Sequence, residues 1–135
     1  FFNWPKASIF MGDVGSASLG YIFAVLCFYD TSNGNIYVWL ILLSLFWFDA
    51  TLTLIRRFRN AEKLTVAHKK HAYQRLVQAG FSHKQVTLCL IGINVIFIIL
   101  LKLVPIYTYP YLFLAIIVFL FFLVKIIDKR KAFDK

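Results

Sequence analysis

Residues 86–104, in the second half of the chain, read VTLCLIGINVIFIILLKLV. A helix needs about 20 residues to cross a hydrocarbon core of roughly 30 Å, and this run has about that length with one charge, Lys102. Further apolar runs occupy residues 14–29, 36–55 and 111–127. None of them shows the alternation of a barrel strand, and a lipid-exposed backbone must satisfy its own hydrogen bonds. The sequence therefore predicts an all-α polytopic membrane protein with about four transmembrane helices.

Composition and charge support this class. The chain is 61% hydrophobic, well above the roughly half that is usual for soluble domains. Of its fifteen Lys and Arg, eight lie between residues 56 and 84 and five between 125 and 135, whereas the links 30–35 and 105–110 carry none. By the positive-inside rule, residues 1–13, 56–86 and 128–135 are expected to be cytoplasmic. This distribution explains the net charge of +9 without a nucleic-acid partner.

The chain reads as part of one membrane domain over residues 1–135. A first hairpin spans residues 14–55, and a second, turned by Pro105 and Pro110, spans residues 87–127. Between them, residues 64–80 have the pattern of a cytoplasmic amphipathic helix. On such a helix the side chains of His68, His71 and Arg75 share one face, because each residue advances by about 100°.

The shared face has two interpretations. Arg forks onto phosphates and His can exchange a proton, so the face suits a phosphate-bearing substrate. The alternative is a solvated basic face on anionic lipid headgroups, a role that also suits Lys69 and Lys70. A zinc site is disfavoured, because His68 and His71 have no Cys or further carboxylate at the usual ligand spacing.

Two carboxylates stand out. Asp49 lies about two turns inside the cytoplasmic end of the second span, where an ionised side chain needs a partner or water. Arg56, seven residues on, lies on the same helical face, so Asp49 belongs either to a structural ion pair or to a polar site. Asp13 stands between Gly12 and Gly15 at the mouth of the first apolar run. It can present both oxygens to a hard cation, and the bland alternative is a turn with a helix cap.

Two groups of motifs resemble the polyprenyl-phosphate N-acetylhexosamine-1-phosphate transferases, a membrane family of the glycosyltransferase 4 type. Residues 3–20, NWPKASIFMGDVGSASLG, are similar to its Phe-Met-Gly-Asp-x-Gly-Ser-x-x-Leu-Gly signature, whose Asp is implicated in magnesium binding. Residues 49–57 (DATLTLIRR), 67–76 (AHKKHAYQRL) and 79–85 (AGFSHKQ) resemble its acidic helix end and its cytoplasmic histidine motif. The resemblance covers residues 3–86 by motif and the last two spans by hydropathy.

The histidine motif departs from the common family pattern. Many members carry His-x-His-His, whereas here His71 is followed by Ala72, Tyr73 and Gln74. This form resembles the bacterial O-antigen-initiating branch, which favours lipopolysaccharide or another surface polysaccharide over peptidoglycan as the pathway. The paired-Asp and Asn-rich Asp-Gly motifs of the family do not occur in these residues. The resemblance therefore implies a C-terminal fragment, inactive without the N-terminal helices of the same enzyme.

The resemblance implies transfer of N-acetylhexosamine-1-phosphate from a UDP-sugar to polyprenyl (undecaprenyl) phosphate at the cytoplasmic face of the bacterial inner membrane. Mg²⁺ is the implied cofactor, and Mn²⁺ suits the same oxygen ligands. The implied roles are metal binding for Asp13, catalysis for Asp13, His71 and His68, and phosphate binding for Arg75 and Lys69. The alternative from another class is a small non-enzymatic four-helix membrane subunit or transporter-like protein, in which Asp49 binds a cation or a partner.

Overall fold

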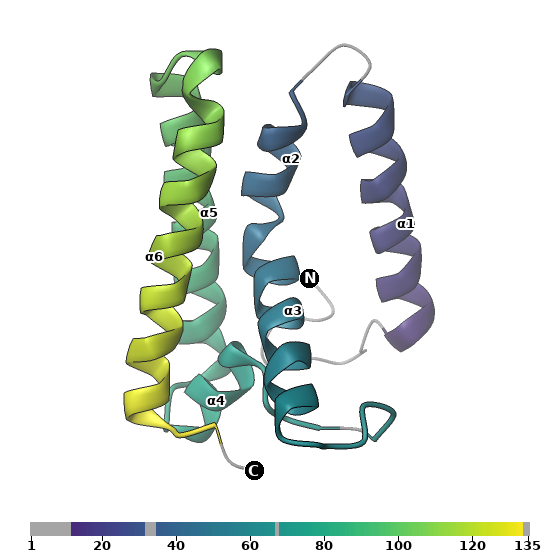
Figure 1. Ribbon diagram of the computed structural model, residues 1–135, viewed down its shortest axis with the longest axis vertical. Coiled ribbons are helices and arrows are strands. Elements are labelled where there is room, and N and C mark those ends of the chain that lie inside the picture. Colours follow the sequence, from purple (N-terminus) through teal and green to yellow (C-terminus); the bar gives the residue numbers. More distant parts are fainter. Residues whose placement is uncertain (1–11, 32–34, 67, 134–135) are drawn as a thin grey trace.

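The computed structural model describes residues 12–31, 35–66 and 68–133, without the side chains of Gly12, Asp13 and Thr31. Every regular element in these residues is a helix (Figure 1), which confirms the predicted all-α class. In chain order the elements are α1 (Gly12–Thr31), α2 (Ile36–Leu42), α3 (Ser44–Arg59), α4 (Ala72–Gln78), α5 (His83–Leu103), the short 3-10 helix η1 (Ile106–Thr108) and α6 (Tyr109–Arg130).

Two helical segments are long and apolar enough to cross a membrane, namely α5 and η1 together with α6. The pair α2 and α3 makes a third candidate span if the two helices are counted as one. The apolar part of α1, Val14–Asp30, is shorter than these spans. Large apolar side chains such as Ile96 and Phe122 lie exposed on α5 and α6, as lipid-facing residues do. The described residues therefore form a polytopic membrane fold with two or three such spans and one shorter apolar helix.

The second span is broken, which corrects the prediction of a continuous helix over residues 36–55. Helices α2 and α3 meet at Leu43 with a bend of 70°. The hydroxyl of Ser44 donates to the carbonyl of Ile41 at 2.6 Å, and the indole Nε1 of Trp47 donates to the carbonyl of Leu40 at 2.9 Å. Side-chain donors thus satisfy carbonyls next to the break, which makes a bend tolerable in an apolar environment.

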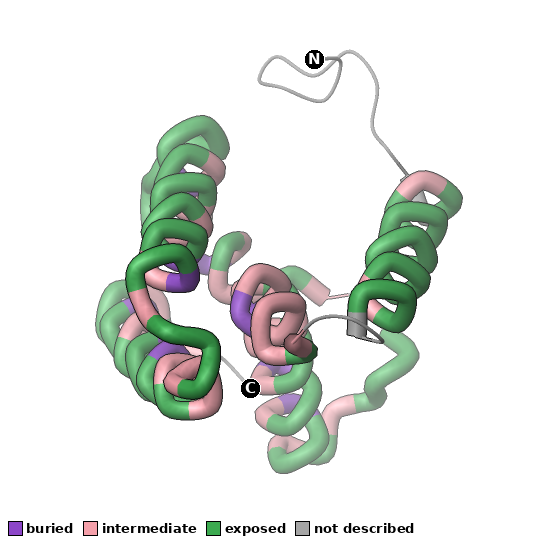
Figure 2. Tube along the Cα trace, turned by 90° about the horizontal axis from the view of Figure 1, so that it is seen from above, coloured by how far each residue is buried: buried purple, intermediate pink, exposed green. Residues whose placement is uncertain are grey.

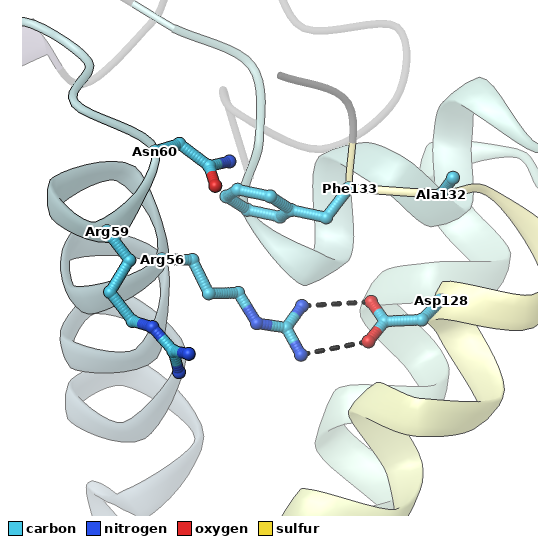
Figure 3. Close-up of a pocket in the computed structure, with 6 residues that line it drawn as sticks. All are labelled: Arg56, Arg59, Asn60, Asp128, Ala132 and Phe133. Atoms are coloured by element: carbon cyan, nitrogen blue, oxygen red, sulfur yellow. Dashed lines mark hydrogen bonds and ion pairs between the residues drawn. The ribbon is translucent and has the colours of Figure 1, made fainter.

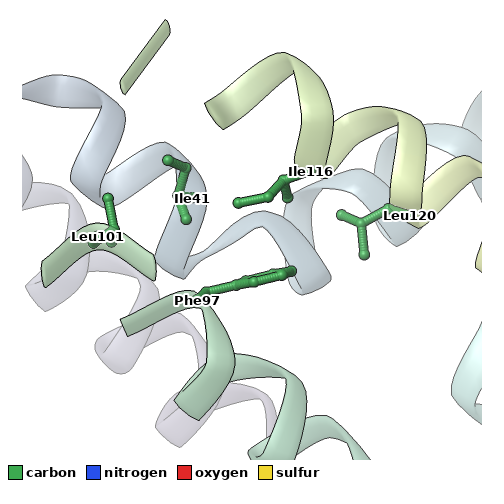
Figure 4. Close-up of a cluster of buried hydrophobic side chains, with 5 residues drawn as sticks. All are labelled: Ile41, Phe97, Leu101, Ile116 and Leu120. Carbon is green, nitrogen blue, oxygen red and sulfur yellow. The ribbon is translucent and has the colours of Figure 1, made fainter. Parts of the chain in front are cut away.

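The apolar core lies where α2 meets the α5–α6 hairpin. Ile41 of α2 packs there against four side chains of the hairpin (Figure 4), which are Phe97, Leu101, Ile116 and Leu120. Pro105 caps η1, and the hydroxyl of Tyr109 donates to the carbonyl of Leu101 at 2.8 Å. The hairpin is therefore turned near Pro105 and Pro110, as the sequence predicts.

Helix α1 stands apart from the rest of the bundle and most of its residues are exposed (Figure 2). It contacts α2, where the indole Nε1 of Trp39 donates to the Asp30 carboxylate at 2.8 Å. Its first residues lie at the same end of the molecule as α4 (Figure 1). This end is called the α4 end below.

The long amphipathic helix predicted over residues 64–80 is wrong, because only Ala72–Gln78 is helical. The guanidinium of Arg57 donates to the backbone carbonyls of Lys63, Leu64 and Val66. In a continuous helix, the carbonyl of Leu64 would accept a bond from the N–H four residues later. Since a buried cation holds these carbonyls instead, the chain forms a folded loop over residues 60–71, of which residue 67 is not described.

Specific hydrogen bonds fix both the start and the end of α4. At its start, the Asp49 carboxylate accepts a hydrogen bond from the N–H of Ala72 at 2.9 Å. At its end, Gly80 has a φ of 102°, and the N–H groups of Gly80 and Phe81 donate to the carbonyls of Val77 and Leu76. This pair of bonds is a Schellman motif, which ends a helix where a glycine can take a positive φ.

Candidate functional site

The centre of the candidate site is a carboxylate–imidazole pair at the α4 end. Asp49 projects from α3, and its Oδ2 lies 3.2 Å from Nδ1 of His71. Its Oδ1 accepts from the N–H of Ala72 at 2.9 Å and from the hydroxyl of Thr53 at 3.4 Å. The side chains of Asp49 and His71 are 18% and 28% exposed, so the pair is half-buried but open to solvent.

The geometry of the pair sets the chemistry that His71 can perform. A carboxylate beside Nδ1 favours the hydrogen on that atom, which leaves Nε2 for a ligand or a proton. The backbone N–H of His71 donates to Oε1 of Gln74 at 3.2 Å, which fixes the residue at the start of α4. The sequence interpretation of Asp49 as part of a polar site therefore has a geometric basis in its pairing with His71.

Of the two interpretations of Asp49, the ion pair with Arg56 is not formed. Both terminal nitrogens of Arg56 donate to the carboxylate of Asp128, at 2.9 and 2.8 Å. Asp128 comes from α6, far away in the sequence, and reaches across to α3 (Figure 3). Spacing along α3 cannot reveal this partner, because the pairing depends on how two helices pack.

The predicted common face of His68, His71 and Arg75 is also wrong, because only Arg75 lies within a helix. His68 lies in the loop, and His71 is the N-cap of α4. The two imidazole rings nevertheless lie together, with centroids 5.0 Å apart. The guanidinium of Arg75 is 3% exposed and donates to Asp128 at 2.6 Å and to the carbonyl of Lys131.

His68 is electrostatically distinct from an ordinary surface histidine. Partial burial lowers the pKa of its imidazole, and the charges of Arg57 and of a protonated His71 lower it further. Its Nδ1 accepts a bond from the N–H of Lys70 at 3.4 Å. The imidazole of His68 is therefore neutral near pH 7, with its hydrogen on Nε2.

Glu62 ties the loop to α3. It accepts from Nζ of Lys70 at 2.8 Å and from Nε of Arg57 at 3.2 Å. The bond from Lys70 is the largest cause of the lowered pKa of the Glu62 carboxyl. The neighbouring Lys69 is exposed, and its backbone carbonyl accepts from the amide of Gln78 at 2.9 Å. Lys69 therefore remains available to a ligand in solution through its side chain.

An open pocket of about 460 Å³ lies beside this loop, at the end of α3 and α6. Its lining residues are Arg56, Arg59, Asn60, Asp128, Ala132 and Phe133 (Figure 3). The ring of Phe133 lies under three cations, with its centroid 5.3 Å from Arg56, 5.4 Å from Lys70 and 5.5 Å from Arg75. Residues that follow α6 thus cover the contact between α3 and α4.

The side chain of Asp13, the predicted metal ligand, lies outside the described residues. Its backbone belongs to the first turn of α1, at the α4 end (Figure 1). Among the residues that the structure describes, no three or more His, Cys, Asp or Glu side chains gather where they could hold a metal ion. The magnesium site therefore stays a prediction that rests on Asp13.

Sequence reasoning missed Asp128, Arg57 and Phe133. Asp128 carried a usable signal, because it is the only carboxylate between Glu62 and Asp134 and lies among cations at the end of a span. Arg57 carried none, since it stands beside Arg56 in a basic run.

Two comparisons with known proteins give matches. The sequence profile of a family described as glycosyl transferase family 4 matches residues 1–31. Over an alignment of 146 residues, the chain is 31% identical to a probable undecaprenyl-phosphate N-acetylglucosaminyl 1-phosphate transferase of Bacillus subtilis (strain 168). The alignment covers 100% of this chain and 41% of that relative, and no solved structure matches. The chain, whose described residues form an all-helical membrane segment, spans about two fifths of this relative's length. It is similar to glycosyl transferase family 4 over its first 31 residues and to the Bacillus subtilis transferase over its whole length.

Proposed function

We propose that the protein to which this chain belongs transfers N-acetylhexosamine-1-phosphate from a UDP-sugar to undecaprenyl phosphate. The family and the relative support this reaction class. The observation that carries it here is the Asp49–His71 pair, with the ring of His68 beside it. His71 and His68 offer two neighbouring imidazole groups at the end of the apolar helices. At this level of the membrane a lipid phosphate can meet a water-soluble nucleotide.

Phosphoryl transfer depends on charge stabilisation and alignment more than on covalent help from the protein. Asp49 fixes the ring of His71, so Nε2 of His71 accepts a proton from a substrate oxygen when it is unprotonated and donates to a phosphate oxygen once it is protonated. Nδ1 of His68 accepts a bond from the backbone and carries no hydrogen, so the ring donates its Nε2–H to a second phosphate oxygen. These two contacts orient the reacting phosphate without adding two fixed charges to the site.

Lys69 and Arg75 are the proposed phosphate contacts. The exposed ammonium of Lys69 neutralises phosphate charge in the headgroup layer. Arg75 differs, because its guanidinium is already held by Asp128. A phosphate can engage Arg75 only by displacing this carboxylate, so Lys69 is the more accessible of the two.

We propose Mg²⁺ as the cofactor, with Mn²⁺ as a substitute of the same ligand preference and Asp13 as a ligand from this chain. Both oxygens of Asp49 already face groups of the chain itself, and Asp128 is held by two arginines. The remaining ligands therefore come from substrate phosphates or from residues outside the described part.

The proposed setting is the bacterial inner membrane, with the α4 end on the cytoplasmic side and the product feeding a surface polysaccharide such as O-antigen. The basic residues that gather at this end support the orientation. A non-enzymatic role, with Asp49 as a cation or partner site, gains no support from the structure. The carboxylate of Asp49 is used by His71 and Ala72 of the same chain.

The test uses the full-length enzyme in lipid nanodiscs with UDP-N-acetylglucosamine and undecaprenyl phosphate, and it measures release of UMP. His71→Ala should lower turnover about 100-fold or more, as loss of a positioned proton-transfer or phosphate-binding group does. His83→Ala is the matched control, because His83 is an exposed histidine outside the pair, and Lys70→Ala should cost less than His71→Ala. Equal losses in all three variants would instead support a diffuse basic surface. If the parent enzyme shows no turnover with any UDP-N-acetylhexosamine, the proposed reaction is rejected.

A further inference from the structure

Asp128 joins three segments of the chain at the α4 end. From α6, its carboxylate accepts two bonds from Arg56 of α3 and a 2.6 Å bond from Arg75 of α4. Such a two-pronged Arg–carboxylate pair is directional as well as strong. Asp128 thus ties α4 to both α3 and α6.

The buried positive charge of Arg75 is compensated by the carboxylate of Asp128. The side chain of Arg75 is 3% exposed, and its Nε has no hydrogen-bond partner within the described structure. Removing one partner of a buried pair leaves the other charge uncompensated, which costs more than the pair itself contributes. The ring of Phe133 covers Arg75 and Arg56, and it gives the cluster further contact with the segment after α6.

The same short helix also carries His71. Asp49 holds the start of α4 through Ala72 and His71, and Asp128 holds Arg75 about one turn later. Helix α4 has only seven residues and packs against α5 and α6, so these two polar anchors fix its position together with that packing. Loss of the Asp128 anchor frees α4 to tilt and moves His71 relative to Asp49.

We propose that Asp128 is a positioning residue, which acts through Arg75 to keep His71 paired with Asp49. Its effect on turnover rests on the function proposed above, whereas its effect on the environment of His71 does not. The structural and catalytic consequences can therefore be tested separately.

The catalytic test uses the full-length enzyme in nanodiscs. Asp128→Asn should lower kcat about 10- to 100-fold with little change in KM for the UDP-sugar, as expected when a catalytic group is misplaced by about 1 Å. Asp128→Glu, which keeps the charge, should recover most of the activity. Asp30→Asn is the matched control, because Asp30 is an exposed aspartate on α1 bonded only to Trp39 in the described structure. A loss shared by the Asn variants at both positions, or no loss at position 128, would overturn the proposal.

A double-mutant cycle with His71→Ala tells positioning from general damage. If Asp128 acts through His71, then Asp128→Asn should change the residual activity of His71→Ala by no more than about twofold, the usual limit of additivity errors. Independent losses that multiply in the double variant would show that Asp128 does not act through His71.

The structural test does not depend on activity. Modification of each histidine by diethyl pyrocarbonate is followed by peptide mass spectrometry, with His83 as the internal reference. The His71-to-His83 rate ratio should rise several-fold in Asp128→Asn and stay unchanged in Asp128→Glu and Asp30→Asn. Should Asp128→Asn not fold, the double variant Asp128→Asn/Arg75→Gln removes the unpaired buried charge and should show the same rise. An unchanged ratio in folded protein rejects the positioning role, while a risen ratio with full activity of His71→Ala rejects only the proposed function.

Discussion

Replacement of Arg57 by Met tests how the loop over residues 60–71 is held. Met preserves much of the aliphatic packing of Arg57 and removes its donors. Arg57 is 3% exposed, and it donates to Glu62 and to the carbonyls of Lys63, Leu64 and Val66. Within the described structure, no other side chain donates to these three carbonyls, so the loop should open when the guanidinium is lost.

The free energy lost on replacing Arg57 depends on how well water can reach the carbonyls that lose their donor. A hydrogen bond from a charged donor contributes about 1.5 to 3 kcal/mol, but water can reach the carbonyls of these exposed loop residues. With this discount, the four bonds together contribute about 3 kcal/mol to closure of the loop. Since about 1.4 kcal/mol is a factor of ten, amide exchange in the loop should speed up about 100-fold.

The assay is hydrogen–deuterium exchange of the nanodisc-embedded protein, with the amides of α5 and α6 as internal controls. Arg57→Lys is the companion variant, because it keeps the charge and loses the fork that reaches several carbonyls. It should give an intermediate increase. An increase of less than about twofold in Arg57→Met would show that the loop is held by something other than Arg57.

Two further predictions concern the metal and pH. Asp13→Asn in the full-length enzyme should cost about 2.7 to 4 kcal/mol of transition-state stabilisation, measured as kcat at saturating Mg²⁺, and near-normal turnover would remove Asp13 from its proposed role. Because the pKa of His68 is lowered below its ordinary 6.5 in the folded protein, the unfolded chain binds more protons as the pH falls below 6.5. The stability of the folded state should therefore decrease as the pH falls from 6.5 to the folded-state pKa of His68, and above pH 6.5 it should not depend on His68. Limited proteolysis of the loop across this pH range should show the decrease. The variant His68→Gln should abolish it.

Most of the transmembrane fold could be predicted because hydropathy is a local property. The apolar runs at 86–104 and 111–127 appear as α5 and α6, and the prolines turn the hairpin as expected. Helix α1 also begins near the predicted residue, although its apolar part is shorter than a full span. In each case the chain segment itself carries the signal, since a lipid-facing helix needs only its own length and side chains.

The candidate site was predicted in part. His68 and His71 do lie together, and Asp49 does belong to a polar cluster. Their arrangement was missed, because helical periodicity describes neighbours within one helix and these residues meet through a loop. Buried Arg57, which turns the backbone at residues 63–66, is invisible to any periodic pattern.

The class of the protein, most of its helical segments and its chemically reactive residues could all be identified from the amino-acid sequence. The bend of the second span at Leu43, the pairing of His71 with Asp49 and the contact of Arg56 and Arg75 with Asp128 became visible only in the folded molecule. The physical reason is the range of the interactions. Apolar burial in lipid is written into consecutive residues, whereas an ion pair between α3, α4 and α6 depends on how those helices pack, which no single segment specifies.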